Sequence, residues 1–93
     1  MSVGKRLDLL SNASATGSGV SLEKGGKHYF MAEATFGGGT VKLQMQTPHG
    51  TWVDVPSGSL TAAGALALDL PPGQYRGNVA TATAVYAWLV PAY

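Results

Sequence analysis

Residues 40–56 read TVKLQMQTPHGTWVDVP, and this stretch decides the fold class. Apolar and polar side chains alternate from Val41 to Met45, which is the period of a half-buried β-strand. Thr47–Gly50 carries proline at the second position and glycine at the fourth, the signature of a type I turn. A return strand begins at Trp52, and Pro56 predicts its end because proline has no N–H to donate to a ladder. The stretch therefore predicts a β-hairpin.

The predicted hairpin has an apolar side and a polar side. We expect the apolar side to be the best-formed part of the core, and it consists of Val41, Leu43, Met45, Val53 and Val55. We expect the polar side to point outward and to offer no reactive geometry, and it consists of Lys42, Gln44, Gln46 and Asp54. The hairpin is thus predicted to be scaffold, so function is expected at the two ends of the chain.

Turns that contain glycine or proline divide the rest of the chain into short segments. Strand character is present at 20–24, 28–36, 66–70 and 74–90. The last segment is long enough for two strands with a break near 81–83, and residues 57–64 are predicted to form a loop with weak strand character. No window combines a 3.6-residue period with helix caps. We therefore expect an all-β fold, a small antiparallel β-sandwich, jelly-roll-like or immunoglobulin-like, of seven or eight short strands.

The composition fits one small domain with a shallow core. Of the 93 residues, 13 are alanine and 13 glycine, and no cysteine is available for a disulfide or a thiolate metal site. We expect such a domain to complete its burial by association. The net charge of +1 is too small for the basic surface of a nucleic-acid-binding protein. Because there is no membrane-length apolar run and no signal-peptide pattern, we expect synthesis in a cytoplasm without a cleaved export signal.

The first 18 residues combine a short leucine pattern with a linker-like stretch. Residues 11–19 read SNASATGSG, a composition typical of flexible linkers. We predict that residues 1–18 form an extended arm or linker and that residues 19–93 form the sandwich domain. A frayed terminus and an arm that anchors on a neighbour both fit this pattern. In the second case, attachment is expected through Lys5, Arg6, Leu7, Leu9 and Leu10.

Residues 84–90 read AVYAWLV, an uncharged, strand-prone run without proline. Such a run is an aggregation hazard on an open sheet edge, so it must be covered inside the fold or paired against another subunit. We favour the subunit contact. The predicted subunit interface consists of Val85, Tyr86, Trp88, Val90 and Tyr93.

The polar residues do not form a recognisable reactive site. His28 and His49 have no partner at metal-ligand spacing, and the carboxylates are spread one to an element. No serine lies in a nucleophile elbow, and Gly37–Gly39 is not followed by the Lys-Ser/Thr of a phosphate loop. We therefore expect no catalytic, cofactor-binding or metal-binding residues and no enzymatic activity. The aromatic side chains can stack on sugar rings, although packing in a core or an interface is the stronger interpretation.

Three stretches of the chain resemble a known group of proteins. They read MAEATFGGGTVKLQMQTPHGTWVDV at 31–55, LPPGQYR at 70–76 and VYAWLV at 85–90. Together they resemble small β-rich proteins encoded among the virion genes of tailed bacteriophages, such as capsid-decoration, head-fibre and tail-associated modules. The resemblance covers residues 29–93. It implies a non-enzymatic structural role, commonly as a symmetric trimer on the particle, with an N-terminal segment that makes the attachment.

On this basis we expect a structural protein of a phage virion, a capsid decoration (cement) or head-fibre protein that docks on the shell through its N-terminal segment. The expected partners are other copies of the chain, with a homotrimer favoured, and the major capsid protein or another virion protein. No cofactor, nucleic acid or membrane is expected, and the expected location is the virion, after synthesis in the host cytoplasm. A tail or connector component and a carbohydrate- or receptor-binding fibre module are the alternatives.

Overall fold

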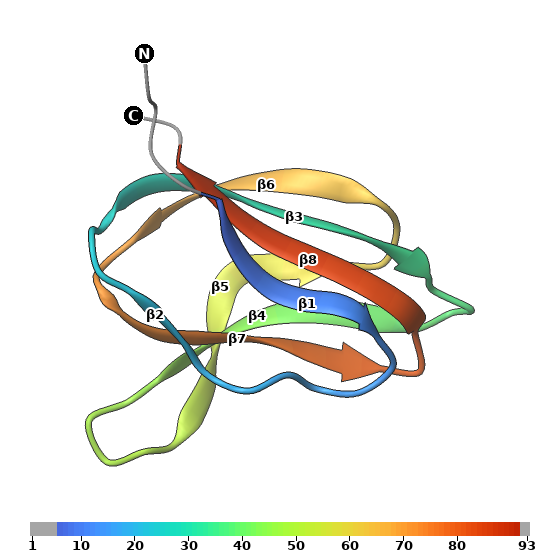
Figure 1. Cartoon of the computed structure of the whole chain (residues 1–93), viewed down its shortest axis with the longest axis horizontal. Helices are drawn as coiled ribbons and strands as arrows, with labels where there is room; N and C mark the ends of the chain where they lie inside the picture. The colour runs from blue at the N-terminus through green and yellow to red at the C-terminus, as the bar shows by residue number, and fades with distance from the viewer. Residues whose placement is uncertain (1–5, 92–93) are drawn as a thin grey trace.

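The computed structural model describes residues 6–91, which form eight β-strands. The strands are β1 (Leu7–Ala13), β2 (Val20–Leu22), β3 (Gly26–Thr35), β4 (Thr40–Gln46), β5 (Trp52–Leu60), β6 (Gly64–Leu70), β7 (Gly73–Ala80) and β8 (Thr83–Pro91). They form two four-stranded antiparallel sheets, sheet A with the order β1-β8-β3-β6 and sheet B with the order β2-β7-β4-β5 (Figure 1). The described residues include no helix long and apolar enough to cross a membrane. The predicted all-β sandwich is confirmed.

The strands pair in nested order. β1 pairs with β8, β2 with β7, β3 with β6 and β4 with β5. This nesting is that of one long hairpin whose tip is the β4–β5 turn. The hairpin is rolled up, so that successive strand pairs lie alternately in sheet A and sheet B. It is the strand order of a jelly roll, so the jelly-roll alternative describes the fold and the immunoglobulin-like one does not.

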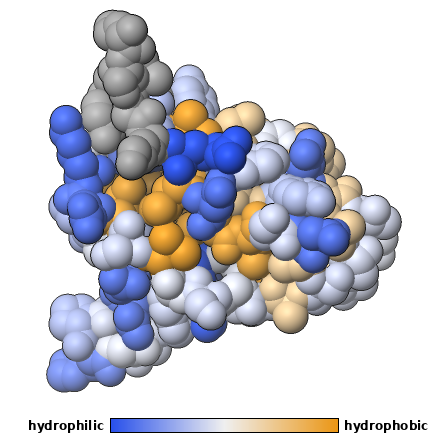
Figure 2. Space-filling model, viewed as in Figure 1, coloured by the Kyte–Doolittle hydropathy of each residue, from blue (hydrophilic) through white to orange (hydrophobic). Residues whose placement is uncertain are grey.

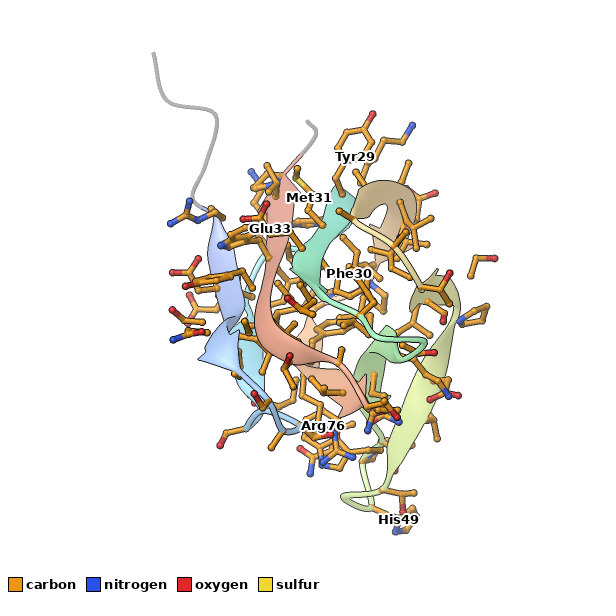
Figure 3. The ribbon with its side chains drawn as sticks, turned by 90° about the vertical axis from the view of Figure 1, so that its right-hand side faces the viewer. Tyr29, Phe30, Met31, Glu33, His49 and Arg76 are labelled. Carbon is orange, nitrogen blue, oxygen red and sulfur yellow. The ribbon has the colours of Figure 1, made fainter. Side chains whose placement is uncertain are left out.

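The β4–β5 turn forms as its sequence predicts. The Gly50 N–H donates to the Thr47 carbonyl at 2.8 Å, and the Thr47 N–H donates to the Thr51 carbonyl at 2.7 Å. Gly50 has a φ of 91°, which glycine adopts readily because it lacks a Cβ. The turn projects beyond the rest of the sandwich (Figure 1), and His49 lies at its tip (Figure 3).

The core consists of inward-facing side chains from both sheets. Its largest fully buried side chains are Tyr75, Phe30, Leu43, Leu89, His28, Val41 and Val85. Within the predicted apolar side of the hairpin, Val41 and Leu43 are fully buried, as expected. Met45 and Val55 are half-buried, whereas Val53 is 45% exposed. The prediction for Val53 is wrong because the residue lies beside the turn, in the part of the hairpin that extends away from the opposite sheet.

β5 continues past the predicted stop at Pro56 and ends at Leu60. Its register with β4 shifts midway, so the residues around Pro56 leave the ladder as a bulge, and Ser57 adopts a φ of 63°. The loop predicted at 57–64 is therefore strand over its first half. A proline is tolerated here because β5 is an edge strand, whose outer side has no ladder for the missing N–H to interrupt.

The predicted N-terminal arm contains the first strand of sheet A. β1 pairs with β8, with Leu7 opposite Leu89, and Leu9 and Leu10 are only 6% and 5% exposed. For the described residues 6–18 the predicted arm is therefore wrong, and so is the domain boundary after residue 18, since the sandwich already includes β1. The leucines face the core because a small chain with few large aliphatic side chains gains most by burying them.

The linker-like stretch after β1 is held along β7. The Gly17 N–H donates to the Gly77 carbonyl at 3.0 Å, and the Thr16 hydroxyl accepts from the Val79 N–H at 3.1 Å. A Cβ at Gly17 would lie 2.7 Å from a core leucine side chain, so glycine is what permits the close approach. The stretch is thus a fixed connection between the two sheets, although its composition is typical of a flexible linker.

Candidate interaction surface

The outer face of sheet A carries large apolar side chains. Outward-facing residues of β3 and β8 lie opposite each other, Tyr29 with Val90 and Met31 with Trp88. We call this surface the aromatic face, and it consists of Tyr29, Met31, Tyr86, Trp88 and Val90. Tyr29 is 42% exposed and Tyr86 36%, and the other three are half-buried. With β1 and β8 in front, apolar surface is visible near the centre of the molecule, among hydrophilic side chains (Figure 2).

Residues of the first and last strands meet on this face because β1 pairs with β8. The rings of Tyr86 and Trp88 stack with 6.4 Å between centroids and 22° between planes. The guanidinium carbon of Arg6 lies 5.7 Å from the centroid of the Trp88 ring, and Arg6 Nε donates to Asp8 Oδ1 at 2.9 Å. Both charged side chains are more than half exposed, so their ion pair adds little stability. Their place beside Trp88 makes them part of the same candidate contact surface.

The structure separates the predicted attachment and interface residues into three groups. Those beside or on the aromatic face are Arg6, Tyr86, Trp88 and Val90. Those buried in the core or packed against it are Leu7, Leu9, Leu10 and Val85. Those outside the described residues are Lys5 and Tyr93. The predicted leucine attachment is therefore wrong, since the buried leucines hold β1 in the sandwich.

Val85 is likewise wrong as an interface residue. Side chains of a strand alternate between its two faces, so Val85, Ala87 and Leu89 all point into the core and all are 0% exposed. Tyr86 and Trp88 take the opposite side. A contact between subunits through β8 can therefore use Tyr86 and Trp88 but not Val85.

Tyr29 and Met31 are the members of the aromatic face that the sequence did not identify. Alternation along 28–36 already sets these two on the side opposite Phe30, and Figure 3 shows Phe30 in the interior. The alternation does not reveal which strand pairs with residues 28–36. Only the pairing of β3 with β8 brings Tyr29 and Met31 beside Trp88.

The outer face of sheet B is polar, and its side chains bond to one another. Arg76 Nε donates to Gln44 Oε1 at 2.8 Å, and Gln44 Nε2 donates to Asp54 Oδ1 at 2.9 Å. Lys42 Nζ lies 3.3 Å from Asp54 Oδ2. We call these four residues the polar network. The hydrogen bond from Gln44, and after it the one from Lys42, lowers the pKa of the Asp54 carboxyl below its ordinary value of 3.8.

Trp52 packs onto this polar network. The guanidinium carbon of Arg76 lies 4.6 Å from the centroid of its ring, a cation–π contact. A Cβ at Gly19 would lie 3.0 Å from the far edge of the indole, so the ring reaches from the hairpin to the connection before β2. Trp52 is half-buried and joins segments that are distant in sequence.

The described residues present surfaces without a recognisable reactive centre. His28 is 1% exposed in the core, where its Nδ1 lies 2.9 Å from the Gly26 carbonyl oxygen, and His49 is exposed at the projecting turn. Within residues 6–91, no three His, Cys, Asp or Glu side chains gather closely enough to hold a metal ion. A pocket of about 190 Å³ opens between β5 and β6. It is walled mainly by Met45, Val53, Val55, Pro56, Leu70, Pro71 and Tyr75.

Comparison of the chain with family models, curated proteins and solved structures finds no match.

Proposed function

We propose that this protein is a non-enzymatic structural module that packs against further copies of itself through the aromatic face. The observation that carries the proposal is the contrast between the outer faces of the two sheets. An antiparallel sheet in a sandwich usually turns a polar side to water, as sheet B does. Sheet A instead presents stacked aromatic rings with methionine and a nearby arginine, which are residue types enriched at protein interfaces.

A second copy is the favoured occupant because the charges around the aromatic face are of both signs. Arg6 and Asp8 lie on β1, Glu33 pairs with Tyr86, and Lys27 pairs with Asp69 across β3 and β6. A surface of this kind can oppose a rotated copy of itself without setting like charges together, whereas a surface of one sign repels its copy.

The size of sheet A is also sufficient for self-association. Four strands about 4.8 Å apart, with a rise of about 3.3 Å per residue, give a flat area of about 500 Å². Interfaces of standard size bury about 800 Å² of accessible surface per partner. Projecting side chains such as Tyr29 add accessible area to the flat value, so the sheet supplies an interface of that order.

We infer that the assembly belongs to a phage virion, as a capsid decoration (cement) or head-fibre protein, with a trimer favoured. The support is the sequence resemblance over 29–93, together with a cysteine-free jelly roll that has an unpartnered aromatic face. The other expected partner is the major capsid protein or another virion protein. Of the predicted attachment residues that the structure describes, Arg6 keeps an exposed side chain for such a contact. A tail or connector role uses the same surfaces.

Light scattering of the purified protein tests the aromatic face. We expect a mass of more than one chain at micromolar concentration, and we expect the double variant Tyr86→Lys/Trp88→Lys to have a smaller mass than wild type. His49→Lys is the matched control, because it adds a charge at the exposed turn, away from sheet A. A wild-type protein that remains a single chain, or a double variant that associates as before, would contradict the proposal.

The polar network supports a second candidate, glycan binding on the outer face of sheet B. Amide, carboxylate and guanidinium groups beside a half-exposed indole are suited to sugar hydroxyls and sugar ring faces. Gln74 Nε2, which donates to Ser21 Oγ at 2.9 Å, extends this row of polar groups to β2. Screening on a glycan array tests the idea. Binding that is lost in Trp52→Ala but retained in Trp88→Lys supports it, and an array without binding rejects it.

A further inference from the structure

The four edge strands of the sandwich differ in how well they are protected against pairing with another chain. Sheet A ends at β1 and β6, and sheet B ends at β2 and β5. The outer side of an edge strand carries N–H and C=O groups without a ladder partner, so proteins usually shorten, bend or charge such strands.

Three of these edges carry such protection. β1 has two register shifts against β8, and its Asn12 has a φ of 49°. β2 is only three residues long. β5 is interrupted by the bulge at Pro56, and Ser57 within it has a positive φ. Each of these features breaks the straight row of groups that an added strand needs.

β6 lacks all of these features. It pairs with β3 through seven consecutive residues, from Gly26 opposite Leu70 to Ala32 opposite Gly64, without a register shift. The strand reads GALALDL, so it contains no proline and no lysine, and Asp69 is its one charged residue. Among the described strands it pairs with β3 alone. Its outer edge is therefore a regular row of backbone groups, seven residues long, with one charged side chain.

The apolar side chains next to this edge are incompletely covered. Leu66 and Leu68 point toward the core but remain half-buried. The pocket of about 190 Å³ lies between β5 and β6, and Val53 on its wall is 45% exposed. The sandwich is thus open on this side, and a strand added to β6 would cover apolar surface as well as satisfy backbone groups.

We propose that β6 pairs antiparallel with β6 of a second copy across a two-fold axis at Ala67. This register uses the whole strand and sets Leu66 opposite the partner's Leu68, which extends the apolar layer. Asp69 falls opposite the partner's Ala65, so no like charges face each other. The result is one continuous sheet, β1-β8-β3-β6-β6-β3-β8-β1. Because the contact lies at a sheet edge and is two-fold, it joins copies in pairs. It does not depend on how many copies associate through the aromatic face.

Disulfide trapping tests the contact, because the chain has no cysteine of its own. Side chains directly opposite in an antiparallel pair have Cβ atoms about 5 Å apart, close to disulfide geometry. We expect Ala67→Cys to form a covalent dimer under mild oxidation at least tenfold faster than Ser11→Cys, an exposed position on the protected edge β1. Equal rates in two folded variants would overturn the proposal.

The same measurement in the Tyr86→Lys/Trp88→Lys background separates the edge from the aromatic face. We expect Ala67→Cys to retain its rapid dimerisation there, since β6 does not need the aromatic face to pair. Rapid dimerisation in the single variant and none in this background would show that the face brings the cysteines together, and would overturn the β6 contact. If only the proposed contact through the aromatic face is wrong, the disulfide-trapped β6 dimer still forms in both backgrounds.

Hydrogen exchange of the unmodified chain provides an independent readout. Packing of faces leaves the outer amides of an edge strand exposed, whereas strand pairing bonds them. We expect the outer amides of β6 to exchange at least tenfold more slowly at high protein concentration than after dilution, and those of β1 to exchange at one rate throughout. Exchange at β6 that does not depend on concentration would overturn the proposal.

Discussion

The outer faces of the two sheets differ in where their side chains find partners. On sheet B, the side chains of the polar network are joined to one another by hydrogen bonds, from Arg76 to Gln44 and from Gln44 and Lys42 to Asp54. The Trp52 ring lies against Arg76. On the aromatic face, Tyr86 and Trp88 stack on each other, but the adjoining apolar surface stays open to solvent.

The side chains on the outer face of sheet B thus find their partners within one chain, whereas the apolar side chains of the aromatic face need a second surface to cover them. The polar network gains its stabilisation when the single chain folds, because each donor in it meets an acceptor of the same chain. The apolar area of the aromatic face gains its stabilisation only when another surface removes it from water. Changes on sheet B should therefore alter folding, and changes on the aromatic face should alter association.

The largest effect is expected from a change in the core between the two sheets, because this core supports both outer faces. Leu10 is 5% exposed, and a Cβ placed on Gly77 would lie 2.7 Å from its Cδ1, so Leu10 reaches from sheet A to β7 of sheet B. We expect Leu10→Ala to lower the free energy of unfolding by about 2–5 kcal/mol because it leaves a cavity between the sheets. Chemical denaturation measures the loss. Leu7→Ala, at a half-buried position, is the control, and an equally small loss in both variants would contradict the place of Leu10 in the core.

The behaviour of the leucines shows why the N-terminal segment could not be read correctly from the sequence. Alternation at Leu7 and Leu9 signals a strand, but the pairing of Leu7 with Leu89 spans nearly the whole chain. Local pattern carries no information on so distant a partner. The composition of SNASATGSG then favoured a detached arm, because glycine permits close packing as readily as it permits flexibility.

Local interactions, by contrast, were predictable. The turn at Thr47–Gly50 needs only the residues of the turn, and Gly50 donates to Thr47 as its sequence indicates. Tyr86, Trp88 and Val90 were predictable as one stripe from the period of two. The remainder of the aromatic face was not, because Tyr29 joins it through the β3–β8 register.

Substitution of two arginines, one beside each outer face, tests the two faces against each other. Arg76→Ala removes the bond to Gln44 and the contact with Trp52, and we expect it to lower the free energy of unfolding by about 1–2 kcal/mol. Arg6→Ala removes an exposed ion pair with Asp8, and we expect a change within about 0.5 kcal/mol. The effect on association should be reversed, with weaker association for Arg6→Ala and none of that weakening for Arg76→Ala.

Denaturation curves and light scattering on the same two samples check this pair. Equal losses of stability would mean that the polar network is no better bonded than the exposed ion pair. Unchanged association of Arg6→Ala would separate Arg6 from the contact made by the aromatic face, and would restrict that contact to β3 and β8.

The smallest expected effect is a pH dependence confined to the polar network. Asp54 has its pKa lowered below 3.8 by the hydrogen bonds from Gln44 and then Lys42. A folded-state pKa below the unfolded one adds stability above the unfolded pKa, and this stability is lost as the pH falls through the folded pKa. We expect the melting temperature of wild type to exceed that of Asp54→Asn at neutral pH and the difference to shrink below about pH 4. A difference that is constant with pH would contradict the lowered pKa.

Salt separates the two causes of that shift. Attraction between exposed charges is screened at an ionic strength of about 1 M, where the Debye length is about 3 Å, but a neutral amide donor is much less affected. If the hydrogen bond from Gln44 is the larger cause, NMR titration of the Asp54 carboxyl should show a pKa that stays low in 1 M salt and rises in Gln44→Ala. A pKa that returns to its ordinary value in salt alone would assign the shift to Lys42, and the polar network would then resemble the exposed ion pair of Arg6 and Asp8 more than a bonded network.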